Sequence, residues 1–405
     1  MIMLSYDNAL RHVLGSREPL RGQQTLLEQA LGLVCAADIV APFPFPPFTN
    51  SAMDGFAVRG SDIRQATNVR PIVLPISGIA VAGSQPSILR ASSAVHIMTG
   101  APLPEGADAV VPIEDVTVTG TDVEFRTPAA DGENVRHRGT DQAPGDVVIQ
   151  AGDVICPAHV GVAAMCGQES ILTIPRPTVA IMSTGDELVT PGQTLRPGCV
   201  YNSNLYAIRA QVIEADGIPT VCIHAGDTIE EISQGLELCK GADIVITIGG
   251  VSMGERDLVR KAVEARGTLD FWKVAIRPGK PLAFGSVHNS AFFGLPGNPV
   301  SAMVTFELFV RPLIRKLGNH RTIHRERKGA NLVEDLTHAP GRRSFQRVNI
   351  SQAGNILHAR PVFSQSSSAL RSMVLANALV EIPEDSTGIK RGEIVSAIMI
   401  GPVAI

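Results

Sequence analysis

Apolar and polar residues follow different spacings along the chain, and each change of spacing predicts a different kind of structure. Residues 5–38 carry apolar positions at helical spacing, most clearly in ALRHVL and QQTLLEQALGLV, so we expect helix there. The stretch 41–50, APFPFPPFTN, contains four prolines and predicts a rigid extended connector. Residues 51–145 carry short β-rich runs between Gly, Pro and Asp turns, which predict an all-β module.

The rest of the chain alternates predicted strands with predicted helices. Residues 146–176 mix strand with a short helix, PAHVGVAAMCG, that glycine ends. Residues 177–317 repeat the order strand, loop, helix, which predicts a mostly parallel sheet covered on both faces. Residues 328–405 return to short strands and turns. Within 177–317 we expect helices at 204–215, 228–240 and 257–266, strands near 271–276, 281–285 and 291–295, and a last long helix after Asn298.

Length, composition and charge limit the class of protein. A chain of 405 residues is too long for one ordinary core, so we expect two to four domains. Hydrophobic content of 44% and charged content of 18% are typical of a soluble globular protein. A net charge of −4 and a single Trp argue against nucleic-acid binding, and we interpret the basic cluster at 311–328 as a solvated helix end and linker. No signal-peptide pattern or run of transmembrane length is present, so we expect a cytoplasmic protein without membrane contact.

Several common kinds of catalytic or metal site are absent from the sequence. The six cysteines form no CxxC pair, so we expect free thiols in a reducing compartment. The ten histidines show no spacing typical of zinc ligands. Neither a GxSxG nucleophile elbow nor a Walker A motif occurs, which argues against a serine hydrolase and a P-loop nucleotidase.

Three loops that follow predicted strands of 177–317 end in acidic residues. TGDEL carries Thr184, Asp186 and Glu187, the next loop carries Asp227, and the third ends at Asp257. Loops at the carboxyl ends of parallel strands meet at one edge of the sheet. A row of carboxylates beside free backbone N–H groups suits Mg²⁺ that in turn holds phosphates. Each loop alone is also consistent with ordinary turn and helix-cap chemistry, and three in order favour a site.

The third loop, GGVSMGERD at 249–257, is the most glycine-rich of the three. Gly249 and Gly250 would let the backbone approach a ligand, and Ser252 is a candidate ligand contact. The loop matches no GxGxxG pattern, so it does not by itself indicate a nucleotide site.

Two further strings concentrate cations and helix-start residues. In WKVAIRPGKPLAFG, Lys273, Arg277 and Lys280 could be strand-end cations, but RPGKP also sets an Arg and a Lys around a rigid turn that could clamp a tetrahedral oxyanion. In GLPGNPVSA, Asn298 is expected to cap a helix and Ser301 lies in its first turn. This string predicts either a well-capped helix or a second anion-binding corner.

The β module offers a few polar residues on tight loops. They are individually uninformative, since such residues are common in turns. They are Asp54 in FTNSAMDGFAV, Thr99 in HIMTGAPLPEG, and Arg136, Arg138 and Asp141 in ENVRHRGTD.

Six strings, taken together and in order, resemble one family. They are FTNSAMDGFAVR, HIMTGAPLPEGADAVVPIE, STGDELVTPG, IGGVSMGERD, RPGKPLAFG and GLPGNPVSA. They are similar to the molybdopterin molybdotransferases, or molybdenum insertases, which include bacterial MoeA and the E domain of gephyrin.

The resemblance implies a multidomain α+β and α/β fold in an elongated four-domain chain. The implied domains are a mixed N-terminal domain (1–45 and 146–176), a β-rich inserted domain (46–145), a central three-layer α/β molybdopterin-binding domain (177–327) and a C-terminal β-barrel (328–405). It also implies a homodimer with an active-site cleft shared between protomers, in which the β module of one chain faces the α/β and C-terminal domains of the other.

The resemblance also implies a reaction. Adenylylated molybdopterin and molybdate would react, dependent on Mg²⁺, to give molybdenum cofactor and AMP. The implied partners are these small molecules and an enzyme that produces the adenylylated substrate. The alternatives that we keep open are a non-catalytic scaffold and a molybdate- or pterin-binding carrier with the same fold.

Roles for individual residues follow from the resemblance. The implied catalytic residues are Asp54, Glu187, Asp227, Asp257 and Lys273, of which Glu187, Asp227 and Asp257 would hold Mg²⁺. The implied substrate-binding residues are Thr99, Arg136, Arg138, Asp141, Thr184, Gly249, Gly250 and Ser252. The implied molybdate pocket comprises Arg277, Lys280, Ser301, Arg347 and Ser367.

Three positions depart from the pattern of the family. Thr49 stands where Asp is usual, and Ser366 stands where Gly is usual. Arg277 stands where Lys is common, which keeps the charge but changes the hydrogen-bond geometry.

Overall fold

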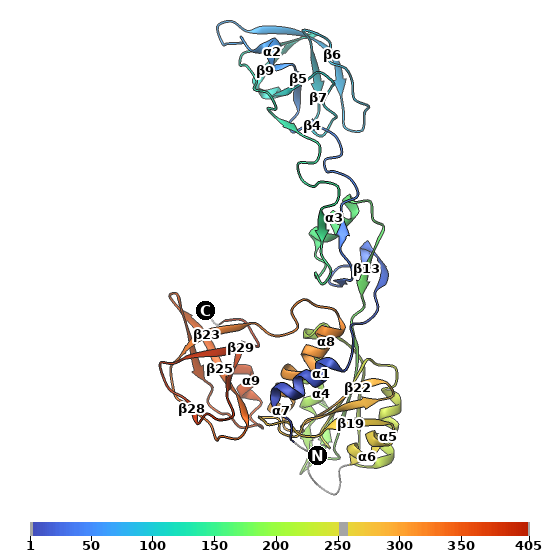
Figure 1. Cartoon of the computed structure of the whole chain (residues 1–405), viewed down its shortest axis with the longest axis vertical. Helices are drawn as coiled ribbons and strands as arrows, with labels where there is room; N and C mark the ends of the chain where they lie inside the picture. Colours follow the sequence, from blue (N-terminus) through green and yellow to red (C-terminus); the bar gives the residue numbers. More distant parts are fainter. Residues whose placement is uncertain (1–2, 251–257, 404–405) are drawn as a thin grey trace. The chain divides into compact units, whose positions relative to one another are not determined.

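The computed structural model describes residues 3–250 and 258–403 and is shown in Figure 1. The described residues form two compact units. Unit 1 comprises Met1–Ala36, Gly152–Cys156 and Ser170–Ile405, and unit 2 comprises Ala37–Ala151 and Pro157–Glu169. None of the described helices is long and apolar enough to cross a membrane.

A six-stranded sheet of order β17-β14-β18-β22-β21-β19 forms the centre of unit 1. β17, β14, β18 and β22 run parallel to one another, whereas β21 is antiparallel to both of its neighbours. The predicted mostly parallel sheet is therefore confirmed. Its strands are β14 (Thr178–Thr184), β17 (Ile218–Ala225), β18 (Ile244–Ile248), β19 (Gly267–Phe271), β21 (Ala283–Val287) and β22 (Ser290–Leu295).

Helices cover both faces of this sheet, because alternate residues of a strand point to opposite sides. Val179 and Ile181 of β14 share a core with α1, α4, α7 and α8. Ala180 and Met182 of the same strand share a core with α5 and α6. The three layers that the sequence predicted are therefore present. The helices are α1 (Tyr6–Gly15), α4 (Ser203–Glu214), α5 (Ile229–Leu238), α6 (Leu258–Glu264), α7 (Pro299–Thr305) and α8 (Arg311–Leu317), with a π-helical turn, η3 (Phe306–Val310), between the last two.

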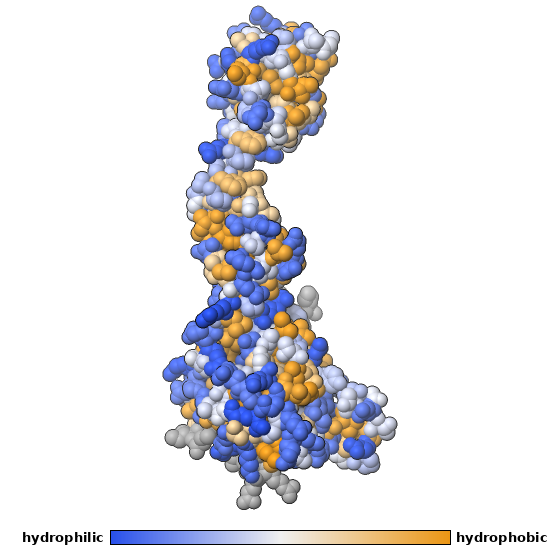
Figure 2. Space-filling model, turned by 90° about the vertical axis from the view of Figure 1, so that its right-hand side faces the viewer, coloured by the Kyte–Doolittle hydropathy of each residue, from blue (hydrophilic) through white to orange (hydrophobic). Residues whose placement is uncertain are grey.

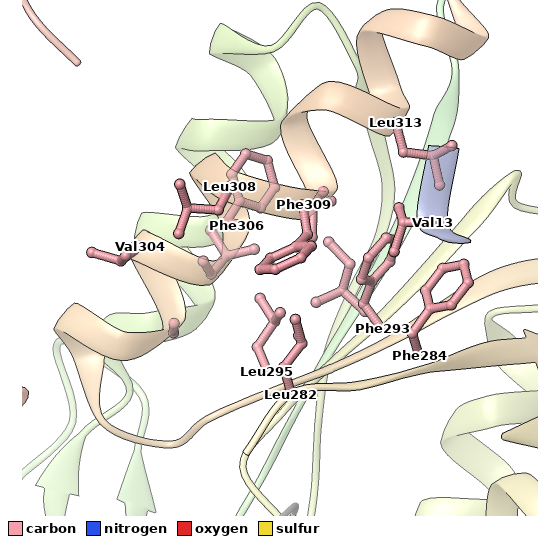
Figure 3. Close-up of a cluster of buried hydrophobic side chains, with 14 of the residues drawn as sticks. Val13, Leu282, Phe284, Phe293, Leu295, Val304, Phe306, Leu308, Phe309 and Leu313 are labelled. Atoms are coloured by element: carbon pink, nitrogen blue, oxygen red, sulfur yellow. The ribbon is translucent and has the colours of Figure 1, made fainter. Parts of the chain in front are cut away.

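Large aromatic side chains fill the layer between the sheet and these helices. Figure 3 shows Phe284 and Phe293 of the sheet beside Phe309 of the η3 turn. The ring centroids of Phe284 and Phe293 lie 4.9 Å apart, and Tyr6 of α1 meets Phe309 edge-on at 5.5 Å. Full burial of each such side chain stabilises the fold by about 1.5–3 kcal/mol. This core fixes the strands whose ends carry the candidate site.

The prediction of helix over 5–38 is correct only for α1. The chain then forms β1 (Gln23–Leu26), a 3₁₀ turn η1 (Leu27–Gln29) and β2 (Val34–Cys35). Both strands pair with β13 (Ser170–Ile174), and the Thr25 and Thr173 hydroxyls are hydrogen-bonded at 2.8 Å. Pairing with a distant strand thus overrides the local helical spacing. Helix α1 itself packs in the core of the α/β sheet through Tyr6 and its neighbours.

Unit 2 is built on a six-stranded sheet of order β8-β5-β7-β6-β10-β9, which confirms the predicted β character of 51–145. Two short pairs, β4 with β11 and β3 with β12, complete its β-structure as the described residues show it. The predicted helix appears as α3 (Pro157–Met165), followed by Gly167 at φ +77°. The other elements are β3 (Ile39–Val40), β4 (Asn50–Ser51), β5 (Gly55–Val58), α2 (Gly60–Ile63), β6 (Ile72–Ala80), β7 (Ala94–Ile97), β8 (Ala109–Pro112), η2 (Ile113–Asp115), β9 (Val116–Thr119), β10 (Asp122–Phe125), β11 (Val135–Arg136) and β12 (Val147–Ile149).

The C-terminal part of unit 1 is a closed five-stranded β-barrel, as the resemblance implied. Its strands follow the order β25-β26-β23-β29-β27, and β27 pairs back with β25 to close the ring. The short strand β20 extends β25 in parallel and links the barrel to the α/β domain. The elements here are β20 (Ile276–Arg277), β23 (Arg327–Leu332), β24 (Leu336–Thr337), β25 (Arg343–Ala353), β26 (Ile356–Pro361), α9 (Arg371–Leu375), β27 (Ala378–Ile382), β28 (Gly388–Ile389) and β29 (Ile394–Met399). The remaining short strands, β15 (Leu188–Val189) and β16 (Val200–Tyr201), pair with each other beside the α/β sheet.

Candidate functional site

The carboxyl ends of the parallel strands in unit 1 open into one cavity of about 1020 Å³, which we call the sheet-edge cavity. Open α/β sheets bind ligands at this edge because the loops after the strands converge there. Most of its walls are loops after β14, β17, β18 and β22, and Asn204 lines it from the first turn of α4. The lining residues are Ser183, Thr184, Gly185, Asp186, Glu187, Leu188, Asn204, Asp227, Ile232, Ile248, Gly249, Gly250, Leu258, Val259, Pro281, Pro296, Gly297 and Asn298.

Five of the predicted site residues lie together in this cavity: Thr184, Glu187, Asp227, Gly249 and Gly250. The expectation that the loops after the strands meet at one edge is thus met for these residues. Two other predicted residues of the third loop, Ser252 and Asp257, lie outside the described residues. Lys273 does not line the cavity, and its carbonyl oxygen accepts a hydrogen bond from the backbone N–H of Leu4 at 3.2 Å.

Two acidic loops of the sheet-edge cavity are joined by reciprocal hydrogen bonds. The backbone N–H of Asp186 donates to Asp227 Oδ2 at 3.3 Å, and the backbone N–H of Asp227 donates to Asp186 Oδ1 at 3.1 Å. Both side chains are exposed. Asp186 is not among the predicted site residues, although it lies in the same TGDEL string as Glu187. These bonds hold two carboxylates close together at the mouth of the cavity.

Gly249 and Gly250 make room for Thr184 and Val259 of this chain. Both glycines have positive φ, +91° and +66°. A Cβ on Gly249 would lie 3.0 Å from the carbonyl oxygen of Thr184, and one on Gly250 would lie 2.5 Å from Val259 Cγ2. The sequence predicted that the backbone at these glycines lies close to a ligand. The structure shows that Thr184 and Val259 of the protein itself lie close to them.

Thr184 offers the cavity a hydroxyl that no other described residue binds. The residue is 5% exposed, and its Oγ1 atom has no hydrogen-bond partner within the described part of the chain. A buried hydroxyl without a partner is costly, so it is typical of a position where a ligand or water completes the bond.

Two asparagines of the cavity were missing from the predicted site. Asn204, in the first turn of α4, donates from Nδ2 to the carbonyl oxygen of Gly297 at 2.7 Å. It thereby joins the start of α4 to the loop after β22. Asn298 occupies the N-cap position of α7, as expected, but its side chain makes no capping hydrogen bond and lines the cavity. Only the tertiary arrangement reveals these two roles, because either residue alone is ordinary at a helix start.

A second cavity of about 410 Å³ lies between the RPGK loop and the barrel, and we call it the barrel cavity. It receives Arg277 and Arg347 of the predicted molybdate pocket. Its lining residues are Arg277, Pro278, Thr337, His338, Ala339, Ser344, Phe345, Gln346, Arg347 and Gln365.

The other three residues of the predicted molybdate pocket, Lys280, Ser301 and Ser367, do not line the barrel cavity. Lys280 is exposed, and Ser301 is buried. The carbonyl oxygen of Ser367 accepts from the backbone N–H of Val300 at 3.1 Å, which places Ser367 beside the first turn of α7, where Ser301 lies. Of the five predicted pocket residues, only the two arginines therefore line the barrel cavity, although the Arg347 Nη2 atom donates to the carbonyl oxygen of Ser366, the residue before Ser367.

Arg347 is a buried cation without a carboxylate partner among the described residues. Its side chain is fully buried, and its Nη2 atom donates to the carbonyl oxygens of Ser364 and Ser366 at 2.9 and 3.1 Å. Its Nε and Nη1 atoms have no hydrogen-bond partner within the described residues. Burial lowers the pKa of the Arg347 guanidinium to about 10. An anion in the barrel cavity would supply the missing charge and acceptors.

In unit 2 the structure brings Asp54 and Thr99 together. The backbone N–H and the hydroxyl of Thr99 both donate to Asp54 Oδ1, at 2.6 and 2.8 Å. These two bonds hold the pKa of the exposed Asp54 carboxyl below its usual range, and the backbone bond has the larger effect. The carboxylate is therefore both ionised and fixed in direction.

The other predicted residues of unit 2 lie on the connector side of the β module. Arg138 donates from its backbone N–H to Thr49 Oγ1 at 3.3 Å and from Nε to the Pro47 carbonyl oxygen at 3.2 Å. The Thr49 hydroxyl thus accepts a bond that an Asp carboxylate at this position could also accept. Arg136 and Asp141 are exposed.

The acidic residues of the sheet-edge cavity suit Mg²⁺ when a bound ligand supplies further oxygen atoms to the ion. No group of three or more His, Cys, Asp or Glu side chains that could hold a metal occurs among residues 3–250 and 258–403. Mg²⁺ is commonly held by one or two carboxylates plus waters and substrate phosphates. Glu187 and Asp227 fit that requirement, and the third predicted ligand, Asp257, lies outside the described residues.

Comparison with known proteins places this geometry in one family. Residues 4–167 match the MoeA N-terminal region (domain I and II), residues 180–316 match a probable molybdopterin binding domain, and residues 330–400 match the MoeA C-terminal region (domain IV). Molybdopterin molybdenumtransferase 2 of Mycobacterium tuberculosis H37Rv is 39% identical over 90% of this chain and 92% of its own. Molybdopterin molybdenumtransferase of Haemophilus influenzae is 36% identical over 97% of this chain and 98% of its own.

A solved structure agrees with the sequence comparison over nearly the whole chain. The molybdopterin biosynthesis moeA protein from Pyrococcus horikosii has a TM-score of 0.85 and 31% sequence identity, and the match covers 99% of this chain and 100% of that one. Sequence and structure both show that this chain belongs to the MoeA family of molybdopterin molybdotransferases.

Proposed function

We propose that this chain is a molybdopterin molybdotransferase, which inserts molybdate into adenylylated molybdopterin in a Mg²⁺-dependent reaction and releases AMP. The relatives named molybdopterin molybdenumtransferase support a transferase of molybdenum cofactor biosynthesis. The observation that carries the proposal is the sheet-edge cavity, where Thr184, Glu187 and Asp227 converge in the domain that matches molybdopterin binding.

The sheet-edge cavity would bind the phosphoanhydride end of the substrate. The Thr184 hydroxyl, which has no partner among residues 3–250 and 258–403, can donate to a phosphate oxygen, and Asn204 holds the α4 start against the loop at Gly297. Glu187 and Asp227 would hold Mg²⁺, which when bound supplies positive charge that stabilises the leaving AMP phosphate. The acidic wall is unfavourable for a bare phosphate, so this arrangement suits a phosphate that arrives with its cation.

Arg347 and Arg277 of the barrel cavity would bind molybdate. The dianion would accept hydrogen bonds from Nε and Nη1 of Arg347 and would neutralise a guanidinium that has no carboxylate partner among the described residues. Ser301 and Ser367 would form a second polar corner where α7 begins.

The decisive measurement is AMP release from adenylylated molybdopterin with Mg²⁺ and molybdate, compared with a characterised family member. We expect AMP release that requires both molybdate and Mg²⁺. Absence of release in the presence of a working control would overturn the proposal. Molybdate binding without AMP release would indicate the carrier alternative, and neither binding nor release would indicate the scaffold alternative.

A homodimer with shared sites is the assembly that we propose for this enzyme. The β module of unit 2 exposes large apolar side chains, including Ile79 (66% exposed) and Ile88 (73% exposed), and Figure 2 shows apolar residues on its visible surface. Contiguous exposed apolar surface is typical of protein–protein contacts. Light scattering, which measures the molar mass in solution, tests whether the chain forms a dimer. Co-expression of Asp54→Ala and Asp227→Ala chains tests the sharing, because only shared sites let two inactive chains restore activity.

A further inference from the structure

The barrel cavity contains a buried histidine that is not among the predicted site residues. His338 directly follows β24 and lines the cavity with Arg277 and Arg347. His338 is only 8% exposed. Neither Nδ1 nor Nε2 has a hydrogen-bond partner within the described residues.

The backbone around His338 is tied to the barrel on both sides. The backbone N–H of His338 donates to the carbonyl oxygen of Thr387 at 2.9 Å. The preceding carbonyl, that of Thr337, accepts from Gln346 Nε2 at 2.7 Å. Strand β24 also pairs with β28. These bonds fix the position from which the imidazole enters the cavity wall.

A neutral imidazole has one N–H donor and one acceptor, and an imidazolium has two donors. A buried ring that uses neither nitrogen loses its hydrogen bonds to water without replacement, which is unfavourable. The same cavity wall holds the Nε and Nη1 atoms of Arg347, which also lack partners in the part of the chain that the structure describes. At least three buried nitrogen donors, two from Arg347 and one or two from His338, therefore line a cavity of about 410 Å³.

The chemistry of these donors selects the class of ligand. The charged groups that line the cavity are Arg277 on β20 and Arg347 on β25, and both are cations. The turn that contains Thr387 also carries Glu384, but its carboxylate is paired with Arg343 at 3.0 Å. Several N–H donors around a cationic centre suit a small oxyanion that accepts hydrogen bonds in several directions.

We propose that His338 is a binding residue for the molybdate oxyanion, which it holds through a ring N–H while Arg347 neutralises the charge. This inference rests on the proposed function and adds a ligand-contacting residue to it. Hydrogen bonds to charged groups contribute about 1.5–3 kcal/mol, so loss of one should weaken binding by about 10- to 150-fold.

The test is calorimetric titration of the full chain with molybdate alone, without the adenylylated substrate. His338→Phe removes both ring nitrogens and keeps an aromatic ring of similar size, and we expect at least about tenfold weaker binding. His338→Gln keeps a side-chain N–H and should recover most of the affinity. His358→Phe is the matched control, because His358 lies on β26 of the same barrel and does not line the cavity. Thermal unfolding of each variant checks the fold, and His338→Ala replaces the Phe variant if that one does not fold.

The outcomes separate this inference from the proposed function. If Arg347→Met abolishes molybdate binding and both nitrogen-free His338 variants bind as the wild type does, the role of His338 is overturned and the transferase stands. If the wild type binds molybdate with the expected His338 dependence but releases no AMP, the transferase fails and the role of His338 stands. If the folded wild type binds no molybdate, or if the Gln variant is as weak as the Phe variant, the His338 proposal is overturned.

Discussion

The two cavities of unit 1 differ in charge and in burial, although both belong to the same compact unit. The sheet-edge cavity displays exposed carboxylates on loops, Asp186, Glu187 and Asp227, and the Thr184 hydroxyl, which no other described side chain or backbone group binds. The barrel cavity holds a fully buried guanidinium and a buried imidazole. One wall is therefore suited to a cation with its phosphates, and the other to a free oxyanion. The two co-substrates of the proposed reaction have these two chemistries.

The comparison predicts that substitutions in the two cavities change different kinetic constants. The largest effect should follow Asp227→Asn, which removes a negative charge but keeps an oxygen for the Asp186 N–H. We expect the rate of AMP release at saturating molybdate to fall by about 100- to 1000-fold, because electrostatic stabilisation of a leaving group is commonly of this size. Glu230→Gln, on the exposed face of α5, is the charge-matched control. Normal turnover in the Asn variant would remove the carboxylates of the sheet-edge cavity from the mechanism.

The second-largest effect should follow Arg347→Met, and it should change how the rate of AMP release depends on the molybdate concentration. We expect the KM for molybdate to rise by about 10- to 150-fold, whereas the affinity for adenylylated molybdopterin stays unchanged. In molybdate-free buffer the midpoint of thermal unfolding should not fall, because a buried cation without a carboxylate partner among the described residues is replaced by an apolar side chain of similar length. The wild type alone should gain thermal stability when molybdate is added. A matching molybdate-dependent gain in the Met variant would show that the oxyanion binds elsewhere.

A smaller effect, on stability, should follow Gly250→Ala in the wall of the sheet-edge cavity. The added Cβ would meet Val259 Cγ2 at 2.5 Å, and φ is +66°. We expect a loss of about 1–3 kcal/mol in the free energy of unfolding, measured by urea denaturation. Gly241→Ala is the control, since Gly241 also has positive φ but nothing lies within 4 Å of its Cβ position. Equal losses in the two variants would show that backbone strain alone is responsible and that the Val259 contact is unimportant.

The sheet and the acidic loops could be predicted because their signals are local and follow chain order. Buried strands such as β14 and β18 are mainly apolar, and parallel topology then places Thr184 and Asp227 at one edge. The 23–26 strand was predicted as helix because its partner, β13, lies about 150 residues away in the sequence. The roles of Asn204 and His338 could not be predicted, because they depend on which cavity a side chain enters and on which of its atoms lack partners.

The predicted molybdate pocket shows the same limit. Arg277 and Lys280 lie in one sequence string and Ser301 lies in another, and the resemblance grouped all three with Arg347 and Ser367. Strand β20 pairs with β25 and places Arg277 beside Ser344 of the barrel, whereas Ser301 lies in the first turn of α7. Arg277 and Lys280 belong to one sequence string, yet only Arg277 lines the barrel cavity, which spacing alone does not reveal.

The smallest predicted effect concerns Asp54 of unit 2, whose carboxylate accepts hydrogen bonds from the uncharged backbone N–H and hydroxyl of Thr99. Thr99 holds the pKa of Asp54 below its usual range through a backbone and a hydroxyl hydrogen bond. A depressed pKa in the folded state means that the stabilisation is fully present above the unfolded pKa of about 3.9 and is lost as pH falls through the folded value. Thr99→Val removes the hydroxyl bond and keeps the backbone one, so we expect the pKa of Asp54 to rise only part of the way to its usual value.

The measurement is an NMR titration of ¹³C-labelled aspartate carboxyls in the full chain, with Thr99→Ser as the control that keeps the hydroxyl. The serine variant should titrate as the wild type does. A pKa of Asp54 that is unchanged in the Val variant would show that the backbone N–H alone orders this carboxylate. In that case the side chain of Thr99 would be free for the substrate contact that the family resemblance implies. A raised pKa would mean instead that the hydroxyl is already used by the protein, so that Asp54 and Thr99 act as one hydrogen-bonded unit.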